Sequence, residues 1–487
     1  MIRKLALTVA LSLSIGGCAS TSAKPALDEV ASTVKSRSGH SLRKGADGAE
    51  DKEAERAIDG LLARPLTADA AVQVALLLSP HLRAKLEELS IARADYVQAG
   101  LLKNPVFGIG KTAWEAEHID PNLFMTVEQD FLDAVTIPLR KRVAATELEA
   151  TKLSVADEVL ALAAETRTAF YEAQAAEEVA AMRALVDDAA HTAADIARSQ
   201  HGAGNMNDLS LTNELGLAAQ TGLERKRAAV ASAVARETLN KHMGTWGKRA
   251  GWKLAAKLPD VPPSEPSLER LESRAIADRL DVAAARRNVQ AMGYTLSLAK
   301  TTRWTGMVSV AVEAGRLRGS ERISFGPSVS LEIPLFDQRQ AQIAKLEAYQ
   351  RRAEQNLEAL AVDVRADVRA ARARMLASRT IVEDYAKGVI PLRENNVRYS
   401  QEMYDAMLLG VYQLIQSKQA EYDAYREYIE AVRDYWIARS DLERAVGGRL
   451  ATDGAPRTPT APSGPSTNPA AGPSAAPPTS SSSHSNH

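Results

Sequence analysis

Two segments of this chain alternate apolar and polar residues with a period of two, the pattern of a β-strand that faces two different environments. The clearer segment runs from Ile323 to Ile333. One face carries Ile323, Phe325, Val329, Leu331 and Ile333, and the other carries Ser324, Gly326, Ser328, Ser330 and Glu332. A tilted strand of about ten residues with this alternation can cross a bilayer with lipid on one side and water on the other. The segment is therefore expected to be a membrane strand.

A second strand precedes this one, and a fainter pair occurs in the first half of the chain. Val308, Val310 and Val312 alternate with small or polar residues, so a hairpin is expected there. The earlier pair is expected at 105–112 and 123–131. Four strands cannot close a barrel, and an open sheet edge in lipid leaves backbone groups unsatisfied at several kcal/mol each. If these strands span a membrane, several copies of the chain must share one barrel.

The N-terminus has the features of a secretory signal. Arg3 and Lys4 form a charged region, and the apolar stretch 5–15 is too short for a transmembrane helix. Two glycines then precede Cys18, the only cysteine, which resembles the acylation box of bacterial lipoproteins. We predict a signal peptide at 1–17, a lipid on Cys18, and an extended lipid-anchored tether at 18–64. Ala19 favours outer-membrane sorting, and the alternative is an ordinary signal peptide with an incidental cysteine.

Composition excludes several classes of partner and structure. The chain has 60 Lys and Arg against 61 Asp and Glu and no basic patch with interleaved aromatic residues, so nucleic acid is not expected as a partner. No run of about eighteen apolar residues exists, so helical membrane spans are not expected. Residues 451–487 are rich in Pro, Ser, Ala and Thr and nearly uncharged, which predicts a disordered tail.

The body of the chain reads as an internal duplication. Several prolines near residue 260 separate a first repeat at 65–258 from a second at 259–450. Each repeat is expected to contain a helix pair, a strand hairpin, a long helix, a turn marked by glycine, and a long returning helix. An Ile-Pro-Leu motif follows each hairpin, around Pro138 and Pro334. Proline there ends the strand and is tolerated at the start of a helix.

The helices are expected to be long and to pack as coiled coil. Proline is absent from 139–204, a segment that would extend about 100 Å as a helix. Apolar residues recur there and in the second half at spacings of three and four, and alanine fills many of the positions that would face a neighbouring helix. Pro391 interrupts the second long helix and should kink it.

Together these segments resemble the family of TolC-like outer-membrane efflux proteins, from about Leu66 to Gly448. The residues that carry the resemblance are Gln98-Ala99-Gly100-Leu101 through Pro105, Gly326-Pro327 through Ile333-Pro334-Leu335-Phe336-Asp337, and the turns that end at Gly204 and Gly410. The resemblance implies a mainly α fold with a small membrane β section, closed in a homotrimer as a twelve-stranded barrel above a tunnel of twelve helices. It further implies a periplasmic adaptor protein and an inner-membrane pump, expected to be proton-driven, as partners. The acylation box at Cys18 further resembles that of the lipoprotein subgroup of this family, which serves resistance-type pumps.

No pattern typical of a catalytic centre occurs, so an enzyme is not expected. The candidates for a gate at the periplasmic tip are Arg198, Gly204, Asp208, Arg398, Tyr404, Asp405 and Gly410. The two aspartates could each form a ring of three carboxylates in a trimer, and such a ring concentrates cations. The arginines, with Tyr399 and Tyr404, could tie neighbouring helices in a closed state. The alternative interpretation is that all of these are ordinary polar turn and helix-end residues.

Gly204 and Gly410 are expected to adopt positive φ at the two helix reversals. Met206, Met403, Met407 and His201 also gather near the turns and hint at passage of copper or silver, although methionine is equally common as a filler of helix packing. No bound cofactor is expected besides the lipid on Cys18.

The sequence therefore predicts a passive outer-membrane channel of a tripartite efflux system, exporting drugs or metal ions. The alternative is a lipid-anchored periplasmic coiled-coil scaffold without a pore, which would leave the amphipathic strands unexplained.

Overall fold

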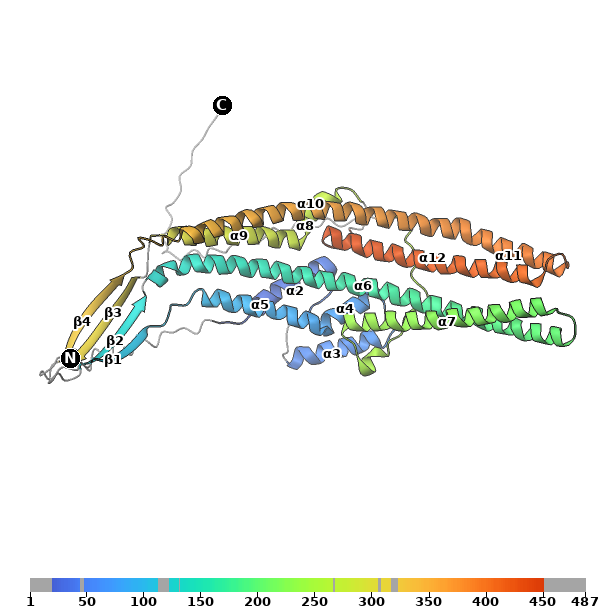
Figure 1. Ribbon diagram of the computed structural model, residues 1–487, viewed down its shortest axis with the longest axis horizontal. Helices are drawn as coiled ribbons and strands as arrows, with labels where there is room; N and C mark the ends of the chain where they lie inside the picture. The colour runs from blue at the N-terminus through green and yellow to red at the C-terminus, as the bar shows by residue number, and fades with distance from the viewer. Residues whose placement is uncertain are drawn as a thin grey trace, which may run out of the picture. The chain divides into compact units, whose positions relative to one another are not determined.

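The two halves of the chain fold into the same succession of elements, which confirms the expected order (Figure 1). The first half contains α4 (Ala68–Leu78), α5 (Pro80–Gln98), β1 (Val106–Thr112), β2 (Asn122–Asp130), α6 (Leu132–Gly202) and α7 (Asp208–Met243). The second half contains α8 (Leu271–Asp278), α9 (Leu280–Thr301), β3 (Val308–Arg316), β4 (Ile323–Leu331), α10 (Gln340–Asp384), the π-helical η2 (Tyr385–Val389), α11 (Ile390–Asp405) and α12 (Val411–Val446). A short 3-10 helix, η1 (Gly247–Ala250), follows α7.

The computed structural model describes residues 20–43, 48–112, 122–130, 132–265, 268–304, 308–316 and 323–450. They belong to one unit that ends at Leu450. The expected signal peptide at 1–17, Cys18 and the expected tail at 451–487 lie outside the described residues. The boundaries of the two repeats, 65–258 and 259–450, stay a prediction.

The strands form one antiparallel sheet in the order β1-β2-β3-β4, so the two hairpins join where β2 pairs with β3. Directly paired residues share a face of the sheet. The register aligns Phe107, Val127 and Val312 across three strands, and it pairs Val310 with Val329. The apolar residues of all four strands therefore form one continuous face, as the alternation predicts.

The opposite face is polar and contains close contacts that require glycine. Thr126 pairs with Glu313, and Ser309 pairs with Ser330. The ring of Phe124 covers its partner Gly110 so closely that a Cβ there would lie 2.2 Å from the ring carbon Cζ. Any larger residue at position 110 would displace this ring.

The outer strands β1 and β4 each have a neighbour on one side only in the described sheet. Their free edges carry backbone N–H and C=O groups that no other described strand pairs, so the described sheet is open on both sides.

The long helices do not begin where the Ile-Pro-Leu motifs predict. Helix α6 begins at Leu132 and contains Pro138, so it lacks one internal backbone hydrogen bond there. In the second half, α10 begins only at Gln340, beyond Pro334. The motif therefore has two different settings: Pro138 lies inside α6, eight residues after β2 ends, whereas Pro334 lies between the end of β4 and the start of α10.

Helix α6 has 71 residues and is about 107 Å long at about 1.5 Å per residue. The second half covers a comparable run with α10, η2 and α11. The π-helical turn lies immediately before Pro391, which has no N–H to donate and whose ring would crowd the carbonyl of residue 387. The irregularity expected at Pro391 is thus a widened turn. None of the described helices combines the length and apolarity needed to cross a membrane.

Helix α6 contacts both halves of the chain, since it packs against α4, α5, α7, α9 and α12. Small side chains line the seam with α7, where Ala190 and Ala194 of α6 meet Ala218. A second cluster joins α8, α10 and α12 around Val368, Met375 and the fully buried Tyr435. The alanine-rich helix packing expected from the sequence is present.

Residues 18–64 were expected to be an extended tether, and this is wrong for the described part. It forms two helices, α2 (Lys24–Ser38) and α3 (Gly48–Leu62). Val30 and Val34 of α2 are buried in a cluster with α4, α5 and α6, and Ile58 of α3 is buried against α4 and α6. The segment is polar in average composition, but apolar residues recur along it at spacings of three and four. Such a stripe is enough to dock a helix on an existing core.

The packing of α2 gives a first prediction. Val34→Asp would bury an unpaired carboxylate, so α2 should detach and residues 20–43 should become sensitive to limited proteolysis. Ser36→Asp adds the same charge on the exposed side of α2 and should leave the segment protected. Equal protection in both variants would show that α2 does not depend on this contact.

Candidate functional site

The first helix reversal, between α6 and α7, is built as the sequence predicts. Gly204 has φ 75°, in the region that glycine adopts without strain. The N–H of Asn205 returns to the carbonyl of Gln200 at 2.9 Å, which closes the end of α6. Asn207 then caps α7, because its Oδ1 accepts from the N–H of Ser210 at 2.8 Å.

The second reversal, between α11 and α12, differs from the expectation. Gly410 has φ −78° and is the residue that precedes α12, so it needs no glycine-specific conformation. The positive φ, 57°, occurs at Met407. The side chains of Met407 and Leu408 are 94% and 73% exposed. A residue with a Cβ in this conformation costs about 1 kcal/mol, and the turn accepts it while presenting two apolar side chains to the outside.

The two aspartates proposed for the gate each have a partner within their own hairpin. Asp208 Oδ1 lies 2.7 Å from His201 Nε2, across the first turn. Asp405 Oδ1 accepts from Gln401 Nε2 at 2.9 Å, one helical turn back along α11. Both carboxylates remain at the tip. Whether they face a pore depends on neighbouring copies, so the ring of carboxylates stays a prediction.

The other gate candidates make contacts within single helices. Arg198 pairs with Asp195 in α6, and the guanidinium of Arg398 lies 5.0 Å from the ring centre of the adjacent Tyr399. Tyr404 is 38% exposed and lies in the last turn of α11. Within one described chain, none of these side chains is seen to join the two hairpins. In the part of the chain that the structure describes, no group of three or more His, Cys, Asp or Glu is arranged to hold a metal ion.

A contact that the sequence did not reveal joins the two hairpins. Arg183 of α6 is 13% exposed and binds two carboxylates, Glu224 of α7 through Nη1 at 2.9 Å and Asp423 of α12 through Nη2 at 3.0 Å. We call this contact the Arg183 bridge. Its two acceptors are distant in the sequence, and Arg183 resembles any other charged residue of a long helix, so no local pattern could have identified it.

The α6–α7 hairpin also contains a buried carboxyl group without a partner. Glu214 of α7 is 4% exposed, and its Oε2 has no hydrogen-bond partner among the described residues. It lies close to the alanine seam that joins α7 to α6. Burial raises the pKa of Glu214 above its usual value, since the charged form loses its hydration.

The α11–α12 hairpin is joined by polar pairs. Ser400 Oγ and Ser417 Oγ lie 2.9 Å apart. Tyr425 donates to Glu394 of α11, and this hydrogen bond raises the pKa of Tyr425 to about 12.

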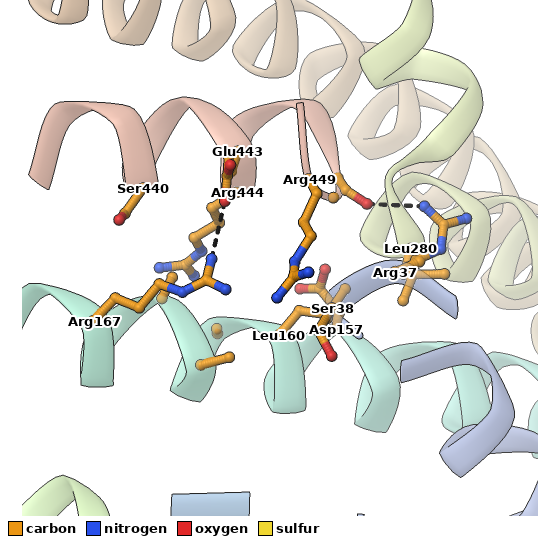
Figure 2. A pocket seen from close by; sticks show the side chains of 15 residues that line it. Arg37, Ser38, Asp157, Leu160, Arg167, Leu280, Ser440, Glu443, Arg444 and Arg449 are labelled. Carbon is orange, nitrogen blue, oxygen red and sulfur yellow. Dashed lines mark hydrogen bonds and ion pairs between the residues drawn. The ribbon is translucent and has the colours of Figure 1, made fainter. Parts of the chain in front are cut away.

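A small cavity marks the junction of α2, α6, α9 and α12, far from the turns along α6 (Figure 2). Its volume is about 50 Å³, which is room for a few water molecules. Arg167 crosses it to pair with Glu443 at 2.9 Å and Asp69 at 3.1 Å, and Arg37 donates to the carbonyl of Gly447 at 2.9 Å. Burial, with the nearby Asp281 carboxylate, raises the pKa of Asp157 to about 6. The cavity is a charged joint between the two halves and is too small to hold a large substrate.

Comparisons with known proteins bear on the fold. No protein-family model matches the sequence, and no curated protein sequence matches it. Solved structures do match. They include a membrane protein of Pseudomonas aeruginosa, with 18% identity, TM-score 0.65 and coverage of 85% of this chain and 95% of the other. CusC matches with 13% identity, TM-score 0.66 and coverage of 78% and 92%.

The outer-membrane protein VceC of Vibrio cholerae matches with 14% identity, TM-score 0.64 and coverage of 79% and 97%. At these identities the comparison establishes the fold. The chain has the TolC-like fold of a long helical section joined to a β section, as the sequence resemblance implied.

The buried carboxyl gives a prediction with a defined pH dependence. Burial of Glu214 costs no charge desolvation while the carboxyl group is protonated. Because burial raises the pKa of Glu214 in the folded protein, the full desolvation cost applies only above that folded-state pKa. The α6–α7 packing should therefore weaken as pH rises through that value. Glu214→Gln should stabilise the hairpin at neutral pH by about 1 kcal/mol and remove this dependence.

Hydrogen exchange of the α6–α7 hairpin, followed between acid and neutral pH, measures the effect. Glu237→Gln, in the same helix, is the control and should retain the wild-type pH profile. A Glu214→Gln protein whose protection factors, taken relative to the intrinsic exchange rate at each pH, still fall as pH rises would contradict the assignment.

Proposed function

We propose that this protein is the outer-membrane channel of a tripartite efflux system, a passive conduit through which drugs or metal ions leave the cell. The observation that carries the proposal is the combination, in one chain, of a sheet with a continuous exposed apolar face and helices about 100 Å long that end in tight turns. A periplasmic scaffold without a pore would lie wholly in water, where an exposed apolar face of this kind is unfavourable. Solved proteins of the same fold include ones described as outer-membrane channels.

The assembly we propose is a homotrimer. Each chain supplies a four-stranded sheet with two free edges, and three such sheets give a closed barrel of twelve strands. Closure pairs every edge group, which lipid requires. The helices of the three chains would then form the tunnel below the barrel.

The partners we propose meet the helix turns. Met407 and Leu408 of the second reversal, with Leu209 of the first, are exposed apolar side chains at one end of the long helices. Such residues suit contact with a periplasmic adaptor protein, which would connect the channel to a proton-driven pump of the inner membrane. No bond-making residue is needed for this role, because the pump supplies the energy.

The lipid anchor we propose on Cys18 agrees with the position of the described N-terminus. Ser20 follows Cys18 by two residues, a reach of about 7 Å at most. The carbonyl of Ser20 accepts from Arg93 Nη2 at 3.4 Å, near the end of α5 that leads into β1. An acyl chain on Cys18 would therefore start near the membrane end of the protein, without the long tether that the sequence suggested.

Channel activity is tested with the full-length protein in planar bilayers, with heat-modifiable trimer bands as a check of assembly. We expect discrete conductance steps that are small at rest. Arg183→Gln breaks a contact that joins α6 to both α7 and α12, so it should raise the resting conductance severalfold. Arg198→Gln removes the same charge but breaks a contact within α6, and its conductance should stay low. Trimers that never conduct would favour a scaffold without a pore.

Ion selectivity tests the tip carboxylates. If Asp208 and Asp405 form rings in the trimer, the resting channel should prefer cations and be blocked by divalent cations from the periplasmic side. Asp405→Ala should weaken both properties without loss of trimers. Reversal potentials in a salt gradient measure the preference. If Asp405→Ala and Asp208→Ala channels both keep the wild-type selectivity, the two aspartates are ordinary polar residues of the turns and do not line the pore.

A further inference from the structure

Basic side chains gather where the helices meet the sheet. Lys141 and Arg142 lie in the first turns of α6, Arg303 follows α9 directly, and Lys345 lies in the first turns of α10. We call these four residues the basic collar. No carboxylate partner is found for any of them among the residues that the structure describes.

Aromatic rings accompany the collar in both halves of the chain. The ring of Tyr96 lies between Lys141 at 5.2 Å and Arg93 at 5.1 Å. Arg303 lies 4.8 Å from the ring centre of Trp304, which is 63% exposed. Lys345 lies 5.5 Å from the ring of Tyr349. Tyr and Trp with neighbouring cations are typical of the boundary between hydrocarbon and water.

The collar continues the apolar face of the sheet. Exposed apolar side chains extend beyond the strand ends, at Leu102 after α5 and at Leu335 and Phe336 after β4. Leu335 keeps the alternation of β4. Lys345 lies about 8 Å and Lys141 about 14 Å along their helices from the first residue, so the collar lies on the helix side of the apolar face.

We propose that the basic collar binds the phosphate groups of anionic phospholipids in the membrane leaflet on the helix side of the sheet. The argument is charge complementarity at an apolar boundary. The collar lies on the helix side of the apolar face, its cations have no carboxylate partner among the described residues, and a cation beside an aromatic ring occurs in both halves of the chain. The collar would fix the depth of the barrel in the bilayer. This inference rests on the proposed function, because it requires the sheet to be in a membrane.

The test uses the full-length protein in bilayers of phosphatidylcholine with labelled phosphatidylglycerol. We expect phosphatidylglycerol to be enriched around the protein, and the enrichment to fall as salt is added. This preference should fall about fivefold for each cation removed, since each cation near an anionic leaflet contributes about 1 kcal/mol. The variant to compare with the wild-type protein is the triple variant Lys141→Gln, Arg142→Gln, Lys345→Gln.

The matched control is the triple variant Lys226→Gln, Arg227→Gln, Lys241→Gln. It removes the same charge from exposed positions of α7, away from the sheet, and should keep the wild-type preference. Equal loss in both variants would assign the effect to net charge and overturn the proposal.

Two other results would also overturn it. One is the absence of any preference for phosphatidylglycerol in the wild-type protein. The other is loss of trimers by the collar variant in lipid-free detergent, which would mean that a neighbouring copy of the chain covers the collar. In each case a channel that still conducts would leave the proposed function intact, whereas failure of the wild-type protein to enter any bilayer would remove the proposed function itself.

Discussion

Backbone hydrogen bonding at the two free edges of the sheet is the constraint on which the rest of the structure depends. Strands β1 and β4 expose N–H and C=O groups that have no partner within one chain. In water such an edge is tolerable, but beside an apolar face turned toward lipid it is not. The described sheet is therefore open at both edges, and the homotrimer proposed above would pair them.

Helix α6 links the sheet to the turns, and it does so with small side chains. The seam of Ala190, Ala194 and Ala218 lets α6 and α7 approach closely, while the α11–α12 hairpin relies on polar pairs such as Ser400 with Ser417. Polar pairs join α6 to α7 as well, since Thr221 Oγ1 donates to Asp187 Oδ1 at 3.1 Å in a buried contact.

Charged side chains make different contacts in three regions of the chain: near the sheet, at the junction cavity, and nearer the helix turns. Near the sheet the cations of the basic collar lack carboxylate partners in the described structure. At the junction cavity, Arg167 pairs with both Glu443 and Asp69 and holds the two halves together. Nearer the turns, the Arg183 bridge connects the hairpins with a contact that can be broken at modest cost.

The sequence by itself determined the elements whose signal is local. Alternation fixed the strands, proline-free apolar periodicity fixed the long helices, and Gly204 marked a reversal, because each follows from a few neighbouring residues. Tertiary structure alone decided what depends on distant partners. Helix α2 exists because a core is available for Val30 and Val34, and the Arg183 bridge exists because α12 returns beside α6. Met407 took the strained turn conformation expected of Gly410, since the geometry of two packed helices selects the position of a turn.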